Sequence, residues 1–143
     1  MEIRPLSSEY AVSPQVNPGD FATIRAAGYT TVINNRPDAE IPATHHSHVM
    51  RAAAEAAGLI FIENPVVSGA LTMENINLQA KAQADSSGPV LAYCASGNRC
   101  SIVWSLTQAG KMRTEAILAA AERAGYQLGH LKPQIDALAA GAA

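Results

Sequence analysis

The stretch PVLAYCASGNRCSIVW (residues 89–104) joins an apolar run, a short polar loop and a second apolar run. The run at 90–93 follows a Gly-Pro pair, which is typical of a buried strand that begins after a turn. Four small or polar residues separate Cys94 from Arg99, and apolar residues resume after Cys100. Both cysteines of the chain lie in this stretch, so it bears on the fold and on the chemistry together.

Strand and helix signals alternate along the rest of the chain. Asn17 followed by Pro-Gly-Asp is typical of a helix start, and Gly28 of its end. We predict strands at 10–13, 29–35, 59–63 and 90–93, and helices at 17–28, 44–58, 71–85, 99–110, 114–125 and 130–140. Continuous apolar strands separated by helices indicate a sheet covered on both faces. The predicted fold is one α/β domain over residues 1–143, with a mostly parallel central sheet flanked by helices.

Composition excludes several classes of function. Hydrophobic residues make up 48% of the chain and the formal net charge is −2, a globular balance without a basic surface for nucleic acid. No apolar window reaches the length of a membrane span. The start MEIRPLSSEY lacks the basic and apolar parts of a signal peptide, and two cysteines make no disulfide framework. We therefore expect a cytoplasmic protein that binds neither nucleic acid nor membrane.

Polar residues follow three of the predicted strands. Ligands of an open parallel sheet bind beyond the carboxyl ends of its strands, where loops after neighbouring strands meet. The loops at this edge carry Arg36, Asp38, Ser68, Cys94 and Arg99. We expect these residues to face one crevice.

The loop after the strand at 90–93 has the features of an anion site. Its backbone N–H groups can curl inward as a nest, because Gly97 permits the unusual φ that a nest needs. The expected nest is made by Ala95, Ser96, Gly97, Asn98 and Arg99. The N–H groups and the following helix favour the thiolate of Cys94, and the guanidinium of Arg99 can clamp an anion. The alternative is a buried, inert Cys94 in a plain turn.

YCASGNRCSIVW (93–104) resembles the active-site loop of protein-tyrosine-phosphatase-like and rhodanese-like domains. YAVSPQVNPGDFATIRAAGYTTVINNRPDAE (10–40) resembles the phosphatase-like domain of the beta-lactamase-hydrolase-like proteins, the DUF442 family, and the similarity covers about residues 9–110. The resemblance implies a protein-tyrosine-phosphatase-like or dual-specificity-phosphatase-like fold. Family members also occur fused to persulfide dioxygenase or sulfide-oxidising modules, which implies such an enzyme as a partner.

Two observations favour sulfur transfer over phosphate chemistry. Tyrosine phosphatases place one residue more between cysteine and arginine, whereas the spacing of Cys94 and Arg99 is that of rhodaneses. Phosphomonoester cleavage also needs a general acid, and the loop at 64–72 carries no carboxylate. We predict a sulfurtransferase that holds a persulfide on Cys94, takes sulfur from thiosulfate or a low-molecular-weight persulfide and passes it to a thiol. The alternative is a phosphomonoester hydrolase with a phosphocysteine intermediate and Asp38 as the acid.

Cys100 and Ser101 follow Arg99 where the family pattern CRSG-RS has a serine, and Ala95 replaces the pattern's first arginine. The phosphatase-like role of this position is to assist the departing thiolate. Cys100 can instead resolve a persulfide or close a disulfide with Cys94. The alternative, weighed evenly, is that Cys100 is an inert residue of the helix that faces the core. A switching cysteine pair without turnover is the third reading, a non-catalytic anion or redox sensor.

THHSHV (44–49) places three histidines near a predicted helix start. His45 and His48 share one helix face, but no cysteine or acidic cluster adjoins them to complete a metal site. A solvated helix end is the favoured interpretation. We predict neither a metal nor a cofactor.

Overall fold

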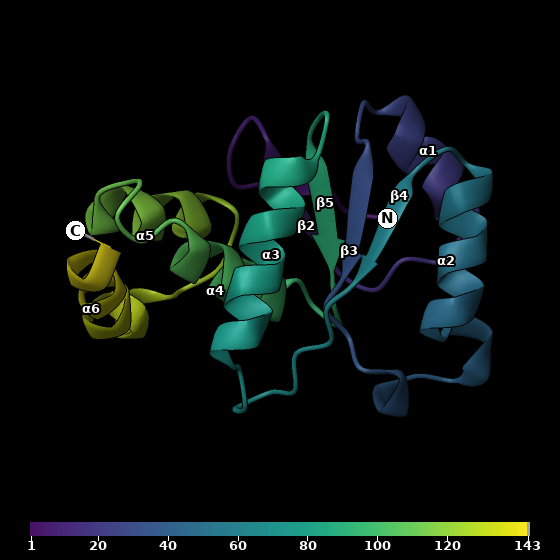
Figure 1. The fold of residues 1–143 in the computed structure, drawn as a ribbon. Helices are drawn as coiled ribbons and strands as arrows, with labels where there is room; N and C mark the ends of the chain where they lie inside the picture. The colour runs from purple at the N-terminus through teal and green to yellow at the C-terminus, as the bar shows by residue number, and fades with distance from the viewer. Residues whose placement is uncertain (143) are drawn as a thin grey trace.

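The computed structural model describes residues 1–142, and this part of the chain contains a five-stranded sheet between layers of helices (Figure 1). The spatial order is β1 (Arg4–Pro5), β2 (Tyr10–Ser13), β5 (Val90–Tyr93), β3 (Thr31–Asn34) and β4 (Ile60–Glu63). The strands β2, β5, β3 and β4 run parallel, and β1 pairs antiparallel with β2. The predicted fold class, an α/β fold with a mostly parallel sheet, is confirmed.

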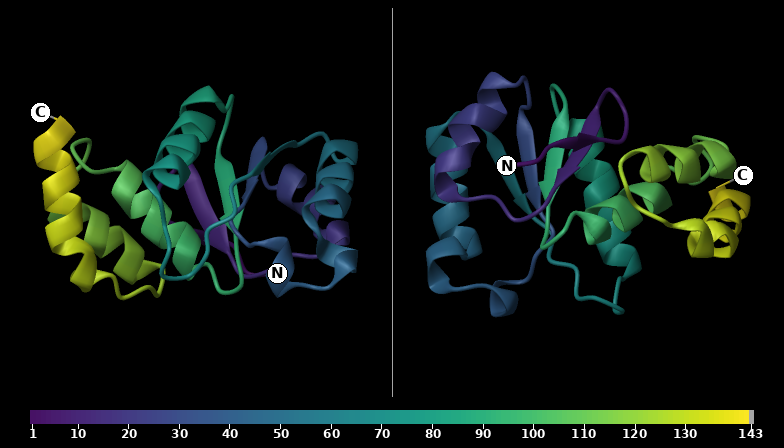
Figure 2. Two further views of the ribbon diagram at one scale, coloured as in Figure 1. Left: turned by 60° about the horizontal axis from the view of Figure 1, so that its bottom comes forward. Right: turned by 180° about the vertical axis from the view of Figure 1, so that it is seen from behind.

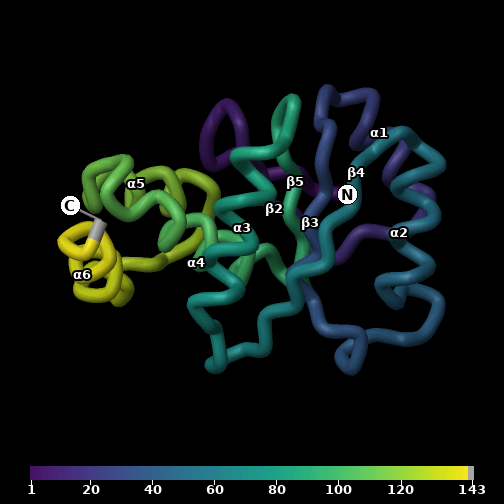
Figure 3. Tube along the Cα trace, viewed as in Figure 1, coloured from purple at the N-terminus to yellow at the C-terminus, as the bar shows by residue number. Residues whose placement is uncertain are grey.

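Helices cover both faces of the sheet. The helices α1 (Phe21–Ala26) and α2 (Ser47–Ala56) lie on one face, as the views in Figure 2 agree. On the other side are α3 (Met73–Asp85) and α4 (Asn98–Thr107), and α5 (Thr114–Arg123) and α6 (Lys132–Ala142) pack on α4. The trace in Figure 3 places these two C-terminal helices beyond α4, away from α1 and α2. Short 3₁₀ turns at Pro18–Asp20, Asp38–Glu40, Ala43–His45 and Gly129–Leu131 complete the elements.

The strand β5 divides the core between the two layers. Leu91 and Tyr93 pack with the residues of α1 and α2, whereas Ala92 and Cys94 pack on the side of α4. This alternation follows from the two-residue period of a strand. Trp104 of α4 is 1% exposed and stacks on another core ring, that of Tyr10, at 6.0 Å between centroids. Cys94 therefore emerges from the sheet on the face that α4 covers.

The structure differs from the predicted elements in several places. The helix expected from residue 44 begins at Ser47, because the backbone of His46 is extended with ψ 157° and separates a 3₁₀ turn from α2. The strand expected to be buried at 59–63 is the edge strand β4, where Ile60 is 56% exposed. The two-residue strand β1 was not expected, since it is too short to show a pattern and contains Pro5.

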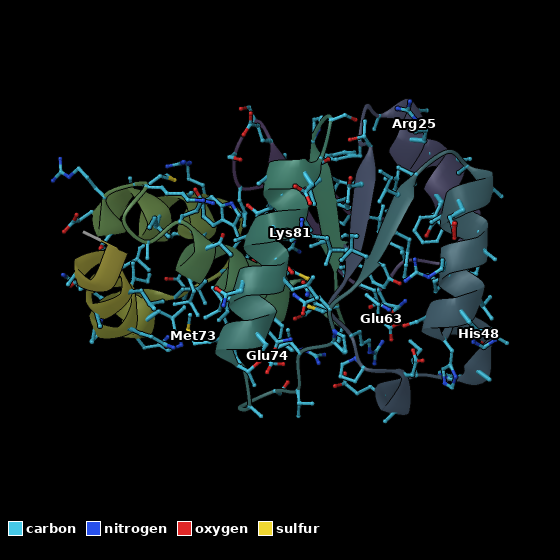
Figure 4. The ribbon with its side chains drawn as sticks, in the orientation of Figure 1. Arg25, His48, Glu63, Met73, Glu74 and Lys81 are labelled. Carbon is cyan, nitrogen blue, oxygen red and sulfur yellow. The ribbon has the colours of Figure 1, made fainter. Side chains whose placement is uncertain are left out.

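The carboxyl ends of the parallel strands and the starts of the following helices lie at one edge of the sheet. In Figure 4, His48 near the start of α2, Glu63 at the end of β4 and Glu74 near the start of α3 lie toward this edge. Arg25 in the last turn of α1 lies at the opposite edge. Within residues 1–142, no helix has the length and apolarity needed to cross a membrane.

Candidate active site

The loop after β5 wraps its N–H groups around the sulfur of Cys94. The side chain is fully buried, and the N–H of Gly97 donates to Sγ at 3.1 Å. The backbone N–H groups of Ser96 and Cys100 also favour negative charge on this sulfur. Gly97 is the N-cap of α4 and has a φ of +91°, a value that side-chain-bearing residues rarely adopt. The loop is thus a nest of N–H donors with the sulfur at its centre.

The nest holds Cys94 as a thiolate. The pKa of Cys94 is lowered to about 5, chiefly because the Cys100 thiol donates a hydrogen bond to its sulfur. Backbone N–H groups of Cys100, Gly97 and Ser96 add to this effect, and burial opposes it. Burial, and then the hydrogen bond to Cys94, raises the pKa of Cys100 well above its usual value. The shared proton therefore stays on Cys100, and Cys94 carries the negative charge near neutral pH.

Replacing Cys100 with alanine is expected to raise the pKa of Cys94 by about one unit, the equivalent of one lost hydrogen bond to a charged group. The thiolate is the form that reacts, so the rate of alkylation by iodoacetamide rises as the pH increases through the pKa. In the native protein the midpoint should lie near 5. Cys100→Ser keeps a donor and is expected to keep most of the shift. Equal midpoints in the native protein and Cys100→Ala would show that the thiol does not activate Cys94.

Arg99 presents one edge of its guanidinium to the protein and leaves the other open. Its Nη1 and Nη2 each donate to one carboxylate oxygen of Glu40 at 2.7 Å, and Nη1 also donates to the carbonyl of Val66 at 2.8 Å. No residue of the described chain accepts from Nε or from the second N–H of Nη2. These two parallel donors fit the two oxygens of a bound anion.

Glu40 fixes the position of Arg99. Its carboxylate also accepts from Nε of Arg36 at 3.3 Å, and Arg36 reaches Gln15 through Nη1 at 3.2 Å. The hydrogen bond from Arg99 is the main cause that lowers the pKa of Glu40, so this carboxylate stays ionised. Nothing in the sequence indicated that Glu40 would contact Arg99, apart from its place two residues after Asp38. Arg36 braces the site through Glu40.

Asp38 lies in the loop after β3, two residues before Glu40, and is anchored through one of its oxygens. Its Oδ1 accepts from the N–H of Ser47 at 2.8 Å and from the hydroxyl at 3.1 Å, and so caps the start of α2. Its Oδ2 has no hydrogen-bond partner in the described part of the chain. Burial, and then the charge of Asp38, raises the pKa of Tyr93, the residue that precedes Cys94. Ser68, also expected at the crevice, is exposed, and its loop reaches Arg99 through Val66 instead.

The hydroxyl of Ser101 does not lie on the sulfur. It donates to the carbonyl of Gly97 at 2.9 Å, one turn back in α4. Cys100 is the neighbour whose side chain contacts Cys94, and both cysteines are free thiols. Cys100, and not Ser101, is therefore positioned to assist a departing thiolate of Cys94.

A buried polar network fixes the loops around the site. The hydroxyl of Tyr10 donates to the carbonyl of Cys100 at 3.0 Å and accepts from Nε2 of Gln79 at 2.9 Å. Oε1 of Gln79 accepts from the side-chain amides of Asn35 at 3.1 Å and Asn64 at 2.8 Å. Asn35 and Asn64 directly follow β3 and β4, so the network ties both loops to α4. The sequence did not predict it, because a buried amide has no pattern of its own.

The histidines contribute to structure, and no metal cluster accompanies them. Nε2 of His45 lies 2.8 Å from Oδ1 of Asn17, and Nε2 of His46 lies 2.9 Å from the carbonyl of Ile41. Residues 1–142 contain no group of three or more histidine, cysteine or acidic side chains that could bind a metal ion. A cavity of about 650 Å³ lies at the amino ends of β2 and β5, away from Cys94, between Glu9, Pro89 and Trp104.

The fold and the cysteine loop define a phosphatase-like domain. The chain belongs to the family described as beta-lactamase hydrolase-like protein, phosphatase-like domain, whose family model matches residues 2–111. The beta-lactamase hydrolase-like protein of Xylella fastidiosa (strain Temecula1) is 32% identical over 131 residues, which cover 90% of this chain. They cover 30% of the relative, so the chain spans less than a third of its length.

Solved structures of the phosphatase class share the fold. A candidate phosphatase from Neisseria meningitidis Z2491 is 29% identical, with a TM-score of 0.83 over 96% of this chain and 99% of its own. Tk-PTP in its active form has a TM-score of 0.73 at 16% identity and covers 96% of both chains. The fold is thus that of protein-tyrosine-phosphatase-like domains. These relatives favour the phosphatase alternative over the predicted sulfurtransferase.

Proposed function

We propose that this domain is a thiol-dependent phosphomonoester hydrolase. The observation that carries the proposal is the joint presence of a Cys94 thiolate in a nest of N–H donors and an open edge on Arg99. In this proposal, Nε and Nη2 of Arg99 hold an anion above the loop whose floor is the sulfur. The similarity to a candidate phosphatase at 29% identity supports phosphate as that anion.

The reaction has two steps. The Cys94 thiolate attacks phosphorus, the S–P bond forms, and the P–O bond to the alcohol breaks while the leaving oxygen takes a proton. Water then attacks the phosphocysteine, which releases inorganic phosphate and restores the thiolate. The low pKa of Cys94 serves both steps, because it supplies the nucleophile and makes sulfur a good leaving group. Arg99 stabilises the charge on the transferred group.

We assign the proton of the leaving oxygen to Oδ2 of Asp38, the oxygen that Ser47 leaves free. Asp38→Asn is expected to slow the hydrolysis of alkyl phosphates about 100-fold, because an unassisted alkoxide leaves poorly. The kcat/KM for an aryl phosphate whose phenol is acidic should fall much less, because that phenolate leaves without a proton. The measurement is kcat/KM across a series of phosphate esters that differ in leaving-group pKa.

Asp38→Asn tests the role of Asp38 as an acid without removing its structural contact. Its side-chain oxygen can still accept from Ser47, so the cap of α2 and the thermal stability should be kept. Ser47→Ala is the matched control, since it removes one partner of Oδ1 without removing the acid. An equal loss for every leaving group in Asp38→Asn would mean that Asp38 supports the loop and does not donate the proton.

Sulfur transfer is the second candidate, and the length of the loop favours it. Only four residues separate Cys94 from Arg99, and the N–H of Gly97 is already directed at the sulfur. In this reaction the thiolate attacks the outer sulfur of thiosulfate, the S–S bond breaks, sulfite leaves, and Cys94 holds a persulfide. A thiol acceptor then takes the outer sulfur, and Cys94 leaves as the thiolate. No acid is needed for either step.

One set of incubations separates the two candidates. Reduced protein is mixed with an aryl phosphate, with thiosulfate or with glutathione persulfide, and its intact mass and products are followed. Turnover of the phosphate with little sulfur transfer is expected. A stable gain of one sulfur atom that passes to cyanide or glutathione, without phosphate release, would make sulfur transfer the function and contradict phosphate hydrolysis. Absence of both reactions, with anion binding retained, would support a sensor.

A further inference from the structure

The C-terminal part of the chain reaches the cysteine loop through Tyr126. This residue lies between α5 and α6, before the 3₁₀ turn at Gly129–Leu131. Its side chain is 6% exposed, and its hydroxyl donates to the carbonyl of Ser96 at 2.9 Å. The family model ends at residue 111, so this contact comes from outside the matched segment.

The carbonyl that Tyr126 holds belongs to the same peptide unit as the N–H on the sulfur. The unit between Ser96 and Gly97 accepts from Tyr126 on one side and donates from Gly97 N to Cys94 Sγ at 3.1 Å on the other. The peptide bond is trans and planar, so its C=O and N–H point in opposite directions. Rotation of this unit would break both hydrogen bonds at once.

Tyr126 is itself held firmly in place. Its N–H donates to the carbonyl of Ala121 at 2.9 Å, at the end of α5. The guanidinium of Arg4 lies over its ring, 5.4 Å from the centroid. The fit to the loop is close, because a Cβ placed on Gly97 would lie 2.2 Å from the Tyr126 hydroxyl oxygen. The strand β1 and α5 thus hold Tyr126 against the loop.

We propose that Tyr126 is a positioning residue for Cys94: its hydroxyl holds the Ser96–Gly97 peptide in the orientation that directs the Gly97 N–H at the sulfur. A hydrogen bond to the carbonyl also polarises the peptide and strengthens its N–H as a donor. The inference rests on the proposed use of Cys94 as a thiolate, and it holds for attack on phosphorus or on sulfur alike.

The other ionisable groups around Cys94 do not change their charge in the pH range in which Cys94 titrates. These groups are Cys100 and Arg99 of α4, Tyr10 of β2, and Tyr126 itself. Burial raises the pKa of both tyrosines, and the pKa of Cys100 is raised too. Only Arg99 among them is charged near neutral pH, and it stays charged across the range in which Cys94 titrates.

The test is the pH dependence of Cys94 alkylation by iodoacetamide, with the modified cysteine identified by peptide mapping. In Tyr126→Phe the midpoint is expected to rise by about one pH unit, because the anchor of one N–H donor is lost. Tyr29→Phe is the matched control, since the Tyr29 hydroxyl has no hydrogen-bond partner in the described chain. Arg4→Gln loosens Tyr126 from outside the loop and should give a smaller rise in the same direction.

The outcomes separate this inference from the proposed function. A low midpoint in the native protein that Tyr126→Phe does not change would overturn the positioning role alone. An ordinary thiol midpoint in the native protein would instead overturn the thiolate on which the proposed function depends. If Tyr126→Phe does not fold, Arg4→Gln decides: a rise supports the inference, and an unchanged midpoint contradicts it.

Discussion

Replacing Cys94 with serine will lower kcat for aryl phosphates by about 10⁵-fold or more, to the level of the uncatalysed reaction with bound substrate. The thiolate is the nucleophile, and a serine hydroxyl at this position remains protonated at neutral pH because a hydroxyl is a much weaker acid than a thiol. The nest that stabilises the thiolate would surround a neutral oxygen and contribute little. The measurement is single-turnover release of the phenol.

Binding should survive this substitution. Arg99 and the loop are unchanged in Cys94→Ser, so the affinity for inorganic phosphate should stay within a few-fold of the native value. Cys100→Ser is the matched control, because it replaces the other thiol in the same loop and should retain most of the activity. Substantial turnover by Cys94→Ser would place the nucleophile elsewhere.

Arg99→Lys is expected to lower kcat/KM by about 10²–10³-fold, although the positive charge is kept. Lysine has a single ammonium group, so it cannot hold Glu40 with one edge and a phosphoryl group with the other. The loss should be largest in the chemical step, where charge on the transferred group is greatest. Steady-state kinetics with one aryl phosphate, measured for both proteins, give this ratio.

Arg36→Lys is the control for the effect of charge in this region. Arg36 contacts the same carboxylate as Arg99 but reaches Gln15 with its other edge. We expect kcat/KM to fall about threefold or less in Arg36→Lys, because a partly exposed ion pair contributes little. Similar losses in both variants would indicate that Arg99 supports the loop through Glu40 without binding the substrate.

Local signals in the sequence were sufficient for most of the fold. Asp20 caps the start predicted at Asn17: the N–H of Asn17 donates to Oδ2 of Asp20 at 2.8 Å, at a 3₁₀ turn that precedes α1. Thr72 is the N-cap of α3, where it accepts from Asn75 N at 3.2 Å. Such caps involve residues three apart, so the pattern in the sequence is the contact itself. The edge position of β4 could not be read in this way, since strand order depends on contacts between distant segments.

The same distinction applies to the candidate site. Cys94, Gly97 and Arg99 lie in one short loop, and their chemistry is visible in the sequence. Glu40 meets Arg99 across 59 residues and Tyr126 meets Ser96 across 30, so neither partner could be identified from spacing. The sulfurtransferase prediction used loop length and a missing acid in 64–72. The free oxygen of Asp38, which the phosphatase proposal uses, became apparent only in the structure.

The covalent state of Cys94 during turnover tests the account most directly. Native protein is mixed with an aryl phosphate, quenched in acid within the first turnover, and analysed by intact mass and peptide mapping. We predict a phosphoryl group on Cys94 that forms at the rate of phenol release and decays as inorganic phosphate appears. Phenol release with no adduct on Cys94, or with the phosphoryl group on another residue, would contradict the proposal.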